Sequence, residues 1–177
     1  MILVTGGARS GKSNFAQSLF DDDKDVVYIA TSRIEDSEMD ERVLLHKANR
    51  PNEWRTFEGT YDLELAVGEE KKYLLDCLTV LTSNIMFDLS KDMEHIDMEV
   101  QNKVENTTVS QITKLYNKLE KIDGELVLVT NELGYSLVPE NHVGRVFRDI
   151  QGRVNQRIAT LSNEVYLVCC GIPVKIK

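Results

Sequence analysis

The stretch from Gly6 to Ser13, GGARSGKS, combines glycines, a lysine and a serine at a spacing that can hold a chain of phosphates. Glycines allow backbone N–H groups to turn inward around phosphate oxygens, Lys12 can reach the β- and γ-phosphates, and the Ser13 hydroxyl can ligate Mg²⁺. A plain glycine turn would not explain the Lys12-Ser13 pair. The motif therefore predicts a nucleoside triphosphate site formed by Gly6, Gly7, Ala8, Arg9, Ser10, Gly11, Lys12 and Ser13.

Such a site needs a carboxylate at the end of another core strand, to hold Mg²⁺ directly or through water. Asp76 follows the apolar run Tyr73–Leu75 and is placed for that task. Glu132, which follows a second apolar run, is the rival. Either acid could instead cap the next helix. We favour Asp76, and with Ser13 it forms the predicted metal site.

A second chemical feature is the spacing of Arg42, His46 and Arg50 at i, i+4 and i+8, which places them on one face of a helix. On spacing alone we favour a solvated face with an ordinary histidine. Neutral imidazole can nevertheless attack phosphorus, and flanking arginines disfavour imidazolium and stabilise charge on a phosphate. Ordinary phosphoryl transfer needs no histidine, so His46 hints at a covalent nucleotidyl step. We interpret His95 and His142 as surface or loop residues.

The elements that must position these residues alternate between strands and helices. Short apolar runs predict strands at Ile2–Thr5, Val26–Ala30, Tyr73–Leu75, Leu126–Thr130 and Val165–Cys170. Amphipathic spacing predicts helices at Ser13–Phe20, Ser37–Asn49, Val100–Ile122 and Val143–Leu161, and the polar stretch Ser90–Glu99 reads as a mobile loop. This alternation predicts an α/β fold with a parallel sheet and right-handed crossovers.

Length and composition narrow the class of protein. A chain of 177 residues fits one domain spanning 1–177. Its net charge of −8 disfavours nucleic acid as the main partner. Three cysteines without CxxC spacing argue against a disulfide framework or a zinc site, so we expect buried thiols in a reducing compartment. We find no signal or membrane-length apolar segment and expect a cytoplasmic protein without a membrane span.

Taken together, the motifs resemble the bifunctional adenosylcobinamide kinase / adenosylcobinamide-phosphate guanylyltransferase family. The resemblance is weakest across Lys91–Asp123. It is carried by Gly6–Ser13, Tyr28–Thr31, Asp36–Met39 with Arg42, His46-Lys47-x-x-Arg50-Pro51-x-x-Trp54, Val129–Gly134, Val138–Asn141, Arg145-x-Phe147-Arg148-Asp149-Ile150-x-Gly152-Arg153-x-Asn155-Gln156, and Gly171–Lys175.

The resemblance implies two activities in cobalamin biosynthesis. The kinase moves the γ-phosphate of ATP or GTP to the aminopropanol hydroxyl of adenosylcobinamide. The guanylyltransferase uses a histidine that attacks the α-phosphate of GTP, releases pyrophosphate, and passes GMP to adenosylcobinamide phosphate to give adenosylcobinamide-GDP. It also implies a RecA-like P-loop fold, mainly a parallel sheet with helices on both faces, and a homo-oligomer for which a trimer is one candidate.

Matched onto this chain, the family pattern makes His46 the nucleophile and Lys12 the second catalytic residue. Lys47 and Arg50 would line the guanylyl site, and Glu58 and Asp76 match acidic positions near the nucleotide. Thr31, Ser32 and Arg33 would lie beside the bound nucleotide, and Mg²⁺ would accompany it. The basic positions of Arg145–Arg157 fit a subunit contact, a substrate contact or a plain polar helix face.

Two other interpretations stay open on the sequence alone. A monofunctional P-loop kinase for another small molecule would need Lys12, Ser13 and an acid but not His46. A nucleotide-sensing GTPase switch is the other. The stretch Asp149–Gly152 matches DxxG, but it lies inside a helical pattern, and no NKxD guanine-reading motif exists.

Overall fold

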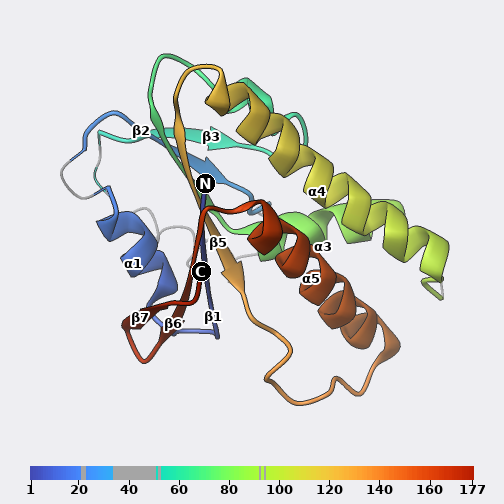
Figure 1. Cartoon of the computed structure of the whole chain (residues 1–177). Coiled ribbons are helices and arrows are strands. Elements are labelled where there is room, and N and C mark those ends of the chain that lie inside the picture. Colours follow the sequence, from blue (N-terminus) through green and yellow to red (C-terminus); the bar gives the residue numbers. More distant parts are fainter. Residues whose placement is uncertain (21–22, 34–50, 52, 92, 94) are drawn as a thin grey trace.

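A seven-stranded sheet forms the centre of the part of the chain that the structure describes. The computed structural model describes residues 1–20, 23–33, 51, 53–91, 93 and 95–177. The strand order is β3-β2-β4-β5-β1-β6-β7, and only β7 runs antiparallel to its neighbour (Figure 1). The strands are β1 (Ile2–Gly6), β2 (Val26–Ala30), β3 (Arg55–Glu58), β4 (Lys72–Asp76), β5 (Glu125–Asn131), β6 (Glu164–Cys169) and β7 (Ile172–Lys175).

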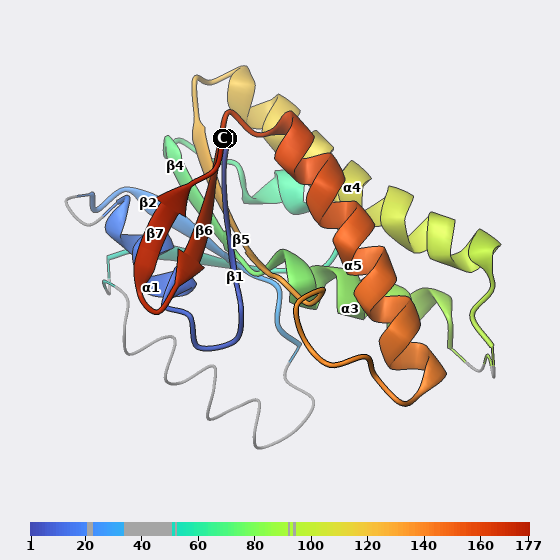
Figure 2. The same cartoon turned by 60° about the horizontal axis from the view of Figure 1, so that its bottom comes forward.

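Helices cover both faces of this sheet, as the resemblance implied. Helix α1 lies on one face, while α3, α4 and α5 lie on the other (Figures 1 and 2). Their bounds are α1 (Lys12–Ser18), α3 (Leu78–Leu89), α4 (Met98–Glu120) and α5 (His142–Leu161), with a short 3₁₀ helix η1 (Leu63–Ala66). The fold is thus an α/β architecture with a mainly parallel sheet. No helix among the described residues has both the length and the apolar character needed to cross a membrane.

Alternation along each strand divides the core into two clusters. Leu3, Ile29 and Leu75 face α3, α4 and α5 and are at most 2% exposed. Val4, Leu74 and Val129 point the other way and pack with Phe20 of the α1 side. Successive side chains of a strand point to opposite faces, so a strand covered on both sides is apolar throughout. This is why the buried strands are readable from the sequence.

Several element boundaries differ from the sequence prediction, and four of the described elements were missed, namely β3, β7, α3 and the short η1. The two edge strands, β3 and β7, are exposed or half-buried along their length, and each is only 4 residues long. Helix α3 was missed because it lies between the sheet and the helices α4 and α5, so apolar residues surround much of it. The predicted helix Ser37–Asn49 lies outside the described residues.

The stretch predicted as a mobile loop, Ser90–Glu99, follows α3, but its last two residues, Met98 and Glu99, already belong to α4. Within its described part, Ile96 is 3% exposed and belongs to the core beside α4. The Asp97 side chain accepts a hydrogen bond from the Val100 backbone N–H at 2.9 Å and caps α4. The end of this segment is therefore anchored by one apolar contact and one helix cap.

Candidate nucleotide-binding site

The parallel register brings the predicted site residues to one edge of the sheet. Ala30, at the end of β2, pairs with Glu58 on one side and with Asp76 on the other. Gly6, at the end of β1, pairs with Asn131 and Val168. Ligands of open α/β sheets bind outside the carboxyl ends of the strands. Glu58, Asp76 and the phosphate loop thus share the edge where a nucleotide is expected.

The phosphate loop turns from β1 into α1 through backbone hydrogen bonds of its own. Ser10 N–H donates to the Gly7 carbonyl at 3.3 Å, and Phe15 N–H donates to the Gly11 carbonyl at 3.0 Å. Neighbouring segments hold the loop from outside: Glu132 N–H donates to the Gly6 carbonyl at 3.0 Å, and Gly171 N–H donates to the Ser10 carbonyl at 2.8 Å. The loop is therefore fixed between β5 and the β6–β7 turn.

Two glycines of the loop are required by space and backbone conformation. A Cβ on Gly6 would lie 2.5 Å from the Val168 carbonyl oxygen, closer than any real Cβ contact. Gly11 has a φ of 92°, and a Cβ there would lie 3.1 Å from the Gly171 Cα. Residues that carry a Cβ rarely adopt that left-handed backbone conformation. The glycine spacing read from the sequence therefore has a steric cause.

Lys12 points back over the loop. Its Nζ donates to the Gly7 carbonyl at 3.1 Å. Partial burial lowers the pKa of Lys12, and the negative charge of Asp76 acts in the opposite direction. An ammonium group short of solvation gains most from a phosphate oxygen, because an opposite charge restores its charged form. The geometry fits Lys12 as a phosphate ligand.

The acid predicted to assist Mg²⁺ is Asp76 rather than Glu132. Helix α3 begins after Cys77, so Asp76 is not its N-cap residue. The Glu132 carboxylate accepts a hydrogen bond from Gly134 N–H at 2.6 Å and is thereby engaged in its own loop. Asp76 ends the strand next to β5, and its charge acts on Lys12.

The two predicted metal ligands, Ser13 and Asp76, offer oxygen atoms only. Among the described residues, no group of three or more His, Cys, Asp or Glu side chains could hold a metal ion. Mg²⁺ prefers oxygen ligands and commonly takes only one or two from the protein, the rest coming from water and substrate phosphates. A hydroxyl on Ser13 and a carboxylate on Asp76 fit that requirement.

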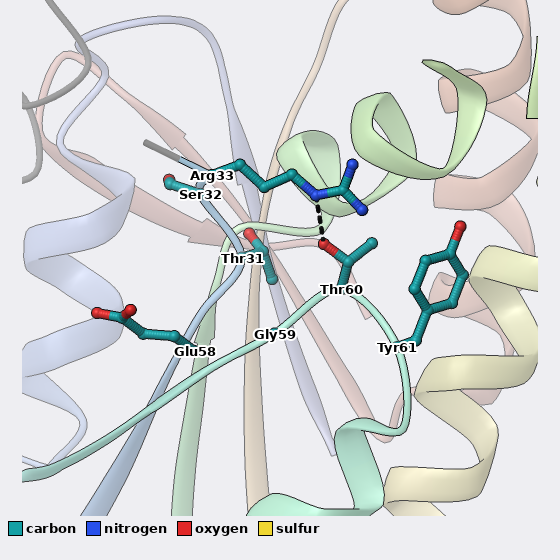
Figure 3. A pocket seen from close by; sticks show the side chains of 7 residues that line it. All are labelled: Thr31, Ser32, Arg33, Glu58, Gly59, Thr60 and Tyr61. Atoms are coloured by element: carbon teal, nitrogen blue, oxygen red, sulfur yellow. Dashed lines mark hydrogen bonds between the residues drawn. The ribbon is translucent and has the colours of Figure 1, made fainter. Parts of the chain in front are cut away.

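A cavity of about 450 Å³ opens beside the phosphate loop's edge of the sheet. Figure 3 shows its lining residues: Thr31, Ser32, Arg33, Glu58, Gly59, Thr60 and Tyr61. Four of them, Thr31, Ser32, Arg33 and Glu58, were predicted from the sequence to lie near the nucleotide. The structure brings these four together from the ends of β2 and β3.

The cavity wall is tied together by hydrogen bonds that the sequence did not reveal. Thr31 Oγ1 donates to the Cys77 carbonyl at 2.8 Å and accepts from Cys77 N–H at 3.1 Å. Asn84 Nδ2 of α3 donates to the Thr31 carbonyl at 2.7 Å and to Thr60 Oγ1 at 3.3 Å. The sequence did not point to Asn84, because the role of a polar residue in an apolar helix depends on which residues lie next to it in space.

Arg33 is engaged within the protein. Its Nη1 and Nη2 donate to the two oxygens of Asp88 at 2.7 and 2.6 Å, and its Nε donates to Thr60 Oγ1 at 3.2 Å (Figure 3 shows the latter bond). Tyr61 OH donates to Asp88 Oδ2 at 2.9 Å. A bidentate arginine–carboxylate pair fixes the guanidinium plane. Arg33 therefore shapes this wall, and Asp88 is its unpredicted partner.

Comparison with known proteins identifies the family of this chain. The family model described as cobinamide kinase / cobinamide phosphate guanyltransferase matches residues 2–176. The chain belongs to this family. Its members are enzymes, named for a kinase and a guanyltransferase activity.

The chain is similar in sequence to several curated members over its whole length. It is 44% identical to the bifunctional adenosylcobalamin biosynthesis protein CobU of Escherichia coli (strain K12), covering 100% of this chain and 99% of that protein. Identity to the protein of the same name from Salmonella typhimurium (strain LT2) is 45%, with the same coverage. CobP of Pseudomonas aeruginosa (strain PAO1), also named a bifunctional adenosylcobalamin biosynthesis protein, is 33% identical over 99% of this chain and 96% of its own length.

Among solved structures, a prototypical ATPase from the type III secretion system of pathogenic bacteria aligns with 94% of this chain at 12% identity. The TM-score is 0.48, and the alignment spans about half of that longer chain, 51%.

The family's histidine motif falls largely outside the described residues. His46, Lys47 and Arg50 belong to the range 34–50, so their predicted roles stay predictions. The tryptophan that closes the motif is described: Trp54 is 4% exposed, and its Nε1 donates to the Asp23 carbonyl at 2.8 Å. Trp54 therefore serves as a packing anchor at the C-terminal end of the motif.

Asn155 of the family motif on α5 has a structural use in the described part of the chain, together with Gln151, whose position the motif leaves open. Gln151 is fully buried, and its Nε2 donates to Thr130 Oγ1 at 3.1 Å and to Asn155 Oδ1 at 2.8 Å. Asn155 Nδ2 in turn donates to the Asn131 carbonyl at 3.0 Å. These bonds fix the end of β5, which carries Glu132 toward the phosphate loop.

The basic residues of α5 mostly contact other groups of the same chain. Arg153 and Arg157 both bind Glu105 of α4, at 2.7 and 3.0 Å. Arg145 donates to the carbonyls of Pro139 and Glu140. These contacts favour a role in packing α5 against its neighbours.

The described cysteines correct one expectation, whereas His95 is exposed, as predicted. His142 is the first residue of α5, and its ring stacks on that of His95 with centroids 4.3 Å apart. Only Cys77 is a buried thiol; Cys169 and Cys170 are exposed. An apolar run misled the prediction for this pair, because β6 ends at Cys169 and the chain then turns at the edge of the sheet.

Proposed function

We propose that this chain performs both reactions of its family. It phosphorylates adenosylcobinamide with ATP or GTP, and it transfers GMP from GTP to adenosylcobinamide phosphate, giving adenosylcobinamide-GDP and pyrophosphate. The observation that supports this most strongly is the match of the family over residues 2–176 in a chain whose phosphate loop is fully formed. We also propose that the protein is cytoplasmic. We further propose that it forms a homo-oligomer, whose mass in solution is a multiple of 20.1 kDa.

In the kinase step, the chain's own groups position and neutralise the phosphates. Backbone N–H groups of Gly7–Ser13 surround the phosphate oxygens, and the Lys12 ammonium offsets the charge that builds up on the γ-phosphate. Ser13 and Asp76 would hold Mg²⁺, which when bound neutralises charge on the phosphates. The acceptor hydroxyl takes the γ-phosphoryl group and gives up its proton, and a nucleoside diphosphate leaves.

In the transferase step, His46 is the nucleophile. One imidazole nitrogen forms a bond to the α-phosphorus of GTP, the bond from that phosphorus to the bridging oxygen of the β-phosphate breaks, and pyrophosphate leaves. A phosphate oxygen of adenosylcobinamide phosphate then attacks the same phosphorus and releases His46. Lys47 and Arg50 would stabilise the charge on the α-phosphate, because cations placed at developing charge lower the barrier.

The walls of the cavity are assigned to the nucleotide in the same proposal. Thr31, Ser32 and Glu58 offer a hydroxyl, a second hydroxyl and a carboxylate from the ends of β2 and β3 (Figure 3). A carboxylate accepts hydrogen bonds from amino and hydroxyl groups, which bases and riboses carry. Arg33 supports this wall through Asp88.

Labelling with GTP that carries a radioactive α-phosphate tests the transferase step. With Mg²⁺ present, the wild-type protein should acquire a label that is stable to alkali and labile to acid, as a phosphoramidate is. His46→Ala should acquire none and should still phosphorylate adenosylcobinamide. His95→Ala is the matched control, since His95 is exposed and outside the predicted machinery.

Three outcomes separate the alternatives. Label in wild type and in His95→Ala, but not in His46→Ala, supports both steps. A wild-type protein that binds GTP and phosphorylates the corrinoid without acquiring label would be a kinase alone. Equal labelling with and without a metal chelator would remove Mg²⁺ from the proposal.

A further inference from the structure

The β6–β7 turn carries two neighbouring thiols that neither proposed reaction uses. Cys169 ends β6, Cys170 and Gly171 form the turn, and Ile172 begins β7, where it pairs with Cys169. Both cysteines are exposed, and their Sγ atoms lie 3.8 Å apart. Successive side chains of a strand normally point to opposite faces, so an extended backbone would separate these thiols.

The backbone of Cys170 is what brings the two sulfurs together. Its φ is 52° and that of Gly171 is 80°, both in the left-handed range. A two-residue hairpin with both central residues left-handed is the type I′ turn, which favours Asn-Gly. Cysteine in the first position is strained relative to a right-handed conformation, because its Cβ crowds the backbone. The turn thus keeps a strained residue whose side chain lies against another thiol.

The same turn is in direct contact with the phosphate loop. Gly171 N–H donates to the Ser10 carbonyl at 2.8 Å, and the Gly171 Cα would lie only 3.1 Å from a Cβ on Gly11 (Figures 1 and 2 show the hairpin tip beside this loop). Val168, one residue before the thiol pair, also closes off Gly6. A change in the conformation of this turn must therefore reach the loop that is proposed to hold the nucleotide.

We propose that Cys169 and Cys170 form a dithiol modification site, oxidised by small-molecule disulfides, whose closure into an intraturn disulfide weakens nucleotide binding at the phosphate loop. This inference rests on the proposed function only in that the phosphate loop must bind a nucleotide. The oxidant is a low-molecular-weight disulfide formed from two thiol-containing metabolites.

The reaction balances as two successive thiol–disulfide exchanges. One protein thiol loses its proton and attacks a sulfur of the small disulfide, forming a mixed disulfide and releasing one small thiol. The neighbouring protein thiol loses its proton and attacks the protein-bound sulfur, forming the Cys169–Cys170 bond and releasing the second small thiol. Two protein thiols are oxidised, and one small disulfide is reduced.

Closure of the ring requires movement. The sulfurs must approach from 3.8 Å to about 2.05 Å, the length of a disulfide bond. The Cα atoms of adjacent residues are about 3.8 Å apart, which is shorter than the usual separation in disulfides, so the ring forms under strain and is easily reduced. The turn must adjust while Gly171 is hydrogen-bonded to the phosphate loop.

The experiment compares the reduced, oxidised and re-reduced forms of the full chain, using oxidised glutathione as the probe. The hydrogen bond to Cys170 raises the pKa of Cys169, so exchange is accelerated by working at about pH 8. Intact mass and peptide mapping detect the modification, and equilibrium binding measures the dissociation constant for GTP. Two variants serve as controls, Cys169→Ser and Cys170→Asn. Asparagine suits the left-handed position, so Cys170→Asn should fold at least as well as wild type.

We expect the wild type to lose the mass of two hydrogen atoms, to bind GTP at least about fivefold more weakly, and to recover when a dithiol reduces it. Both variants should bind GTP like the reduced wild type, and at most they should gain a single glutathione. Arrest of the wild type at the mixed disulfide, a closed ring with unchanged GTP affinity, or equal loss of affinity in Cys170→Asn would each overturn the inference. Failure of the reduced wild type to bind GTP would instead contradict the proposed function as well.

Discussion

Lys12 shows how burial prepares a single residue for phosphate. Its ammonium lies against the Gly7 carbonyl, and burial lowers the pKa of Lys12. Removing a charged hydrogen-bond donor costs about 1.5–3 kcal/mol, which corresponds to roughly 10- to 100-fold in affinity. We expect Lys12→Met to weaken GTP binding by that factor, measured by equilibrium binding on a variant whose thermal unfolding is unchanged.

The lowered pKa also predicts a pH dependence. Phosphate binds the protonated form of Lys12, which is lost as pH rises through the folded pKa. Because that pKa lies below the usual lysine range, GTP affinity should fall at a lower pH than an ordinary lysine would allow. The matched control is Lys12→Arg, since arginine stays protonated throughout. The same decline in both proteins would assign the effect to another group.

For single residues, the sequence predicted features formed by consecutive residues and missed contacts between residues that are far apart in the chain. The phosphate loop follows from eight consecutive residues, and the steric requirements at Gly6 and Gly11 agree with the motif. The Arg33–Asp88 pair could not be found in the same way, since its members are brought together only when the ends of β2 and α3 meet. The exposure of Cys169 was misread because an apolar run does not reveal the end of a strand.

Among the elements, the wall formed by the loops after β2 and β3 is joined to α3 through Asn84 and Asp88. The hydrogen bond from Arg33, and then that from Tyr61, lowers the pKa of Asp88. A depressed carboxylate pKa adds stability that is present above the unfolded value, about 3.9, and is lost as pH falls through the folded pKa. The stabilisation therefore exists at neutral pH and disappears in acid.

Asp88→Asn tests this connection. Both partners keep about a third of their side-chain surface exposed, at 35% and 34%, so solvent screens the pair. We expect the free energy of unfolding to fall by no more than about 1 kcal/mol at pH 7. Urea unfolding near pH 2 should show no difference between variant and wild type. A difference that persists in acid would mean that Asp88 acts through packing.

The sequence predicted the elements that have a clear apolar pattern. It did not predict those whose position depends on contacts with other parts of the fold. Helix α5 was predicted within one residue from its apolar spacing, whereas β3 and β7 lie at the sheet edges and pair on one side only. The role of Gln151 had no signal either. A buried glutamine is explained by its partners Thr130 and Asn155, which sequence periodicity does not identify.

For the whole molecule, nucleotide binding should appear as thermal stability. A ligand at about 100 times its dissociation constant stabilises the folded state by about 2.7 kcal/mol. For a chain of this size each kcal/mol raises Tm by about 2–4 °C, so saturating GTP should raise it by roughly 5–10 °C. Differential scanning calorimetry measures the shift, and Lys12→Met should reduce it. An unchanged Tm in wild type, at a concentration where binding is saturated, would contradict this coupling.

The position of β1 in the sheet has a consequence for how the molecule is made. Leu3 pairs with Leu128 on one side and with Val165 on the other, and the loop after β1 is closed by Gly171. A ribosome makes the phosphate loop before it makes the two strands that flank β1, which are β5 and β6. Domains acquire their long-range pairings only when both partners have emerged, and such pairings are slow to form. The phosphate loop of the nascent chain therefore stays unsupported until β5, β6 and the β6–β7 turn have emerged, and only then can it take the shape that binds a nucleotide.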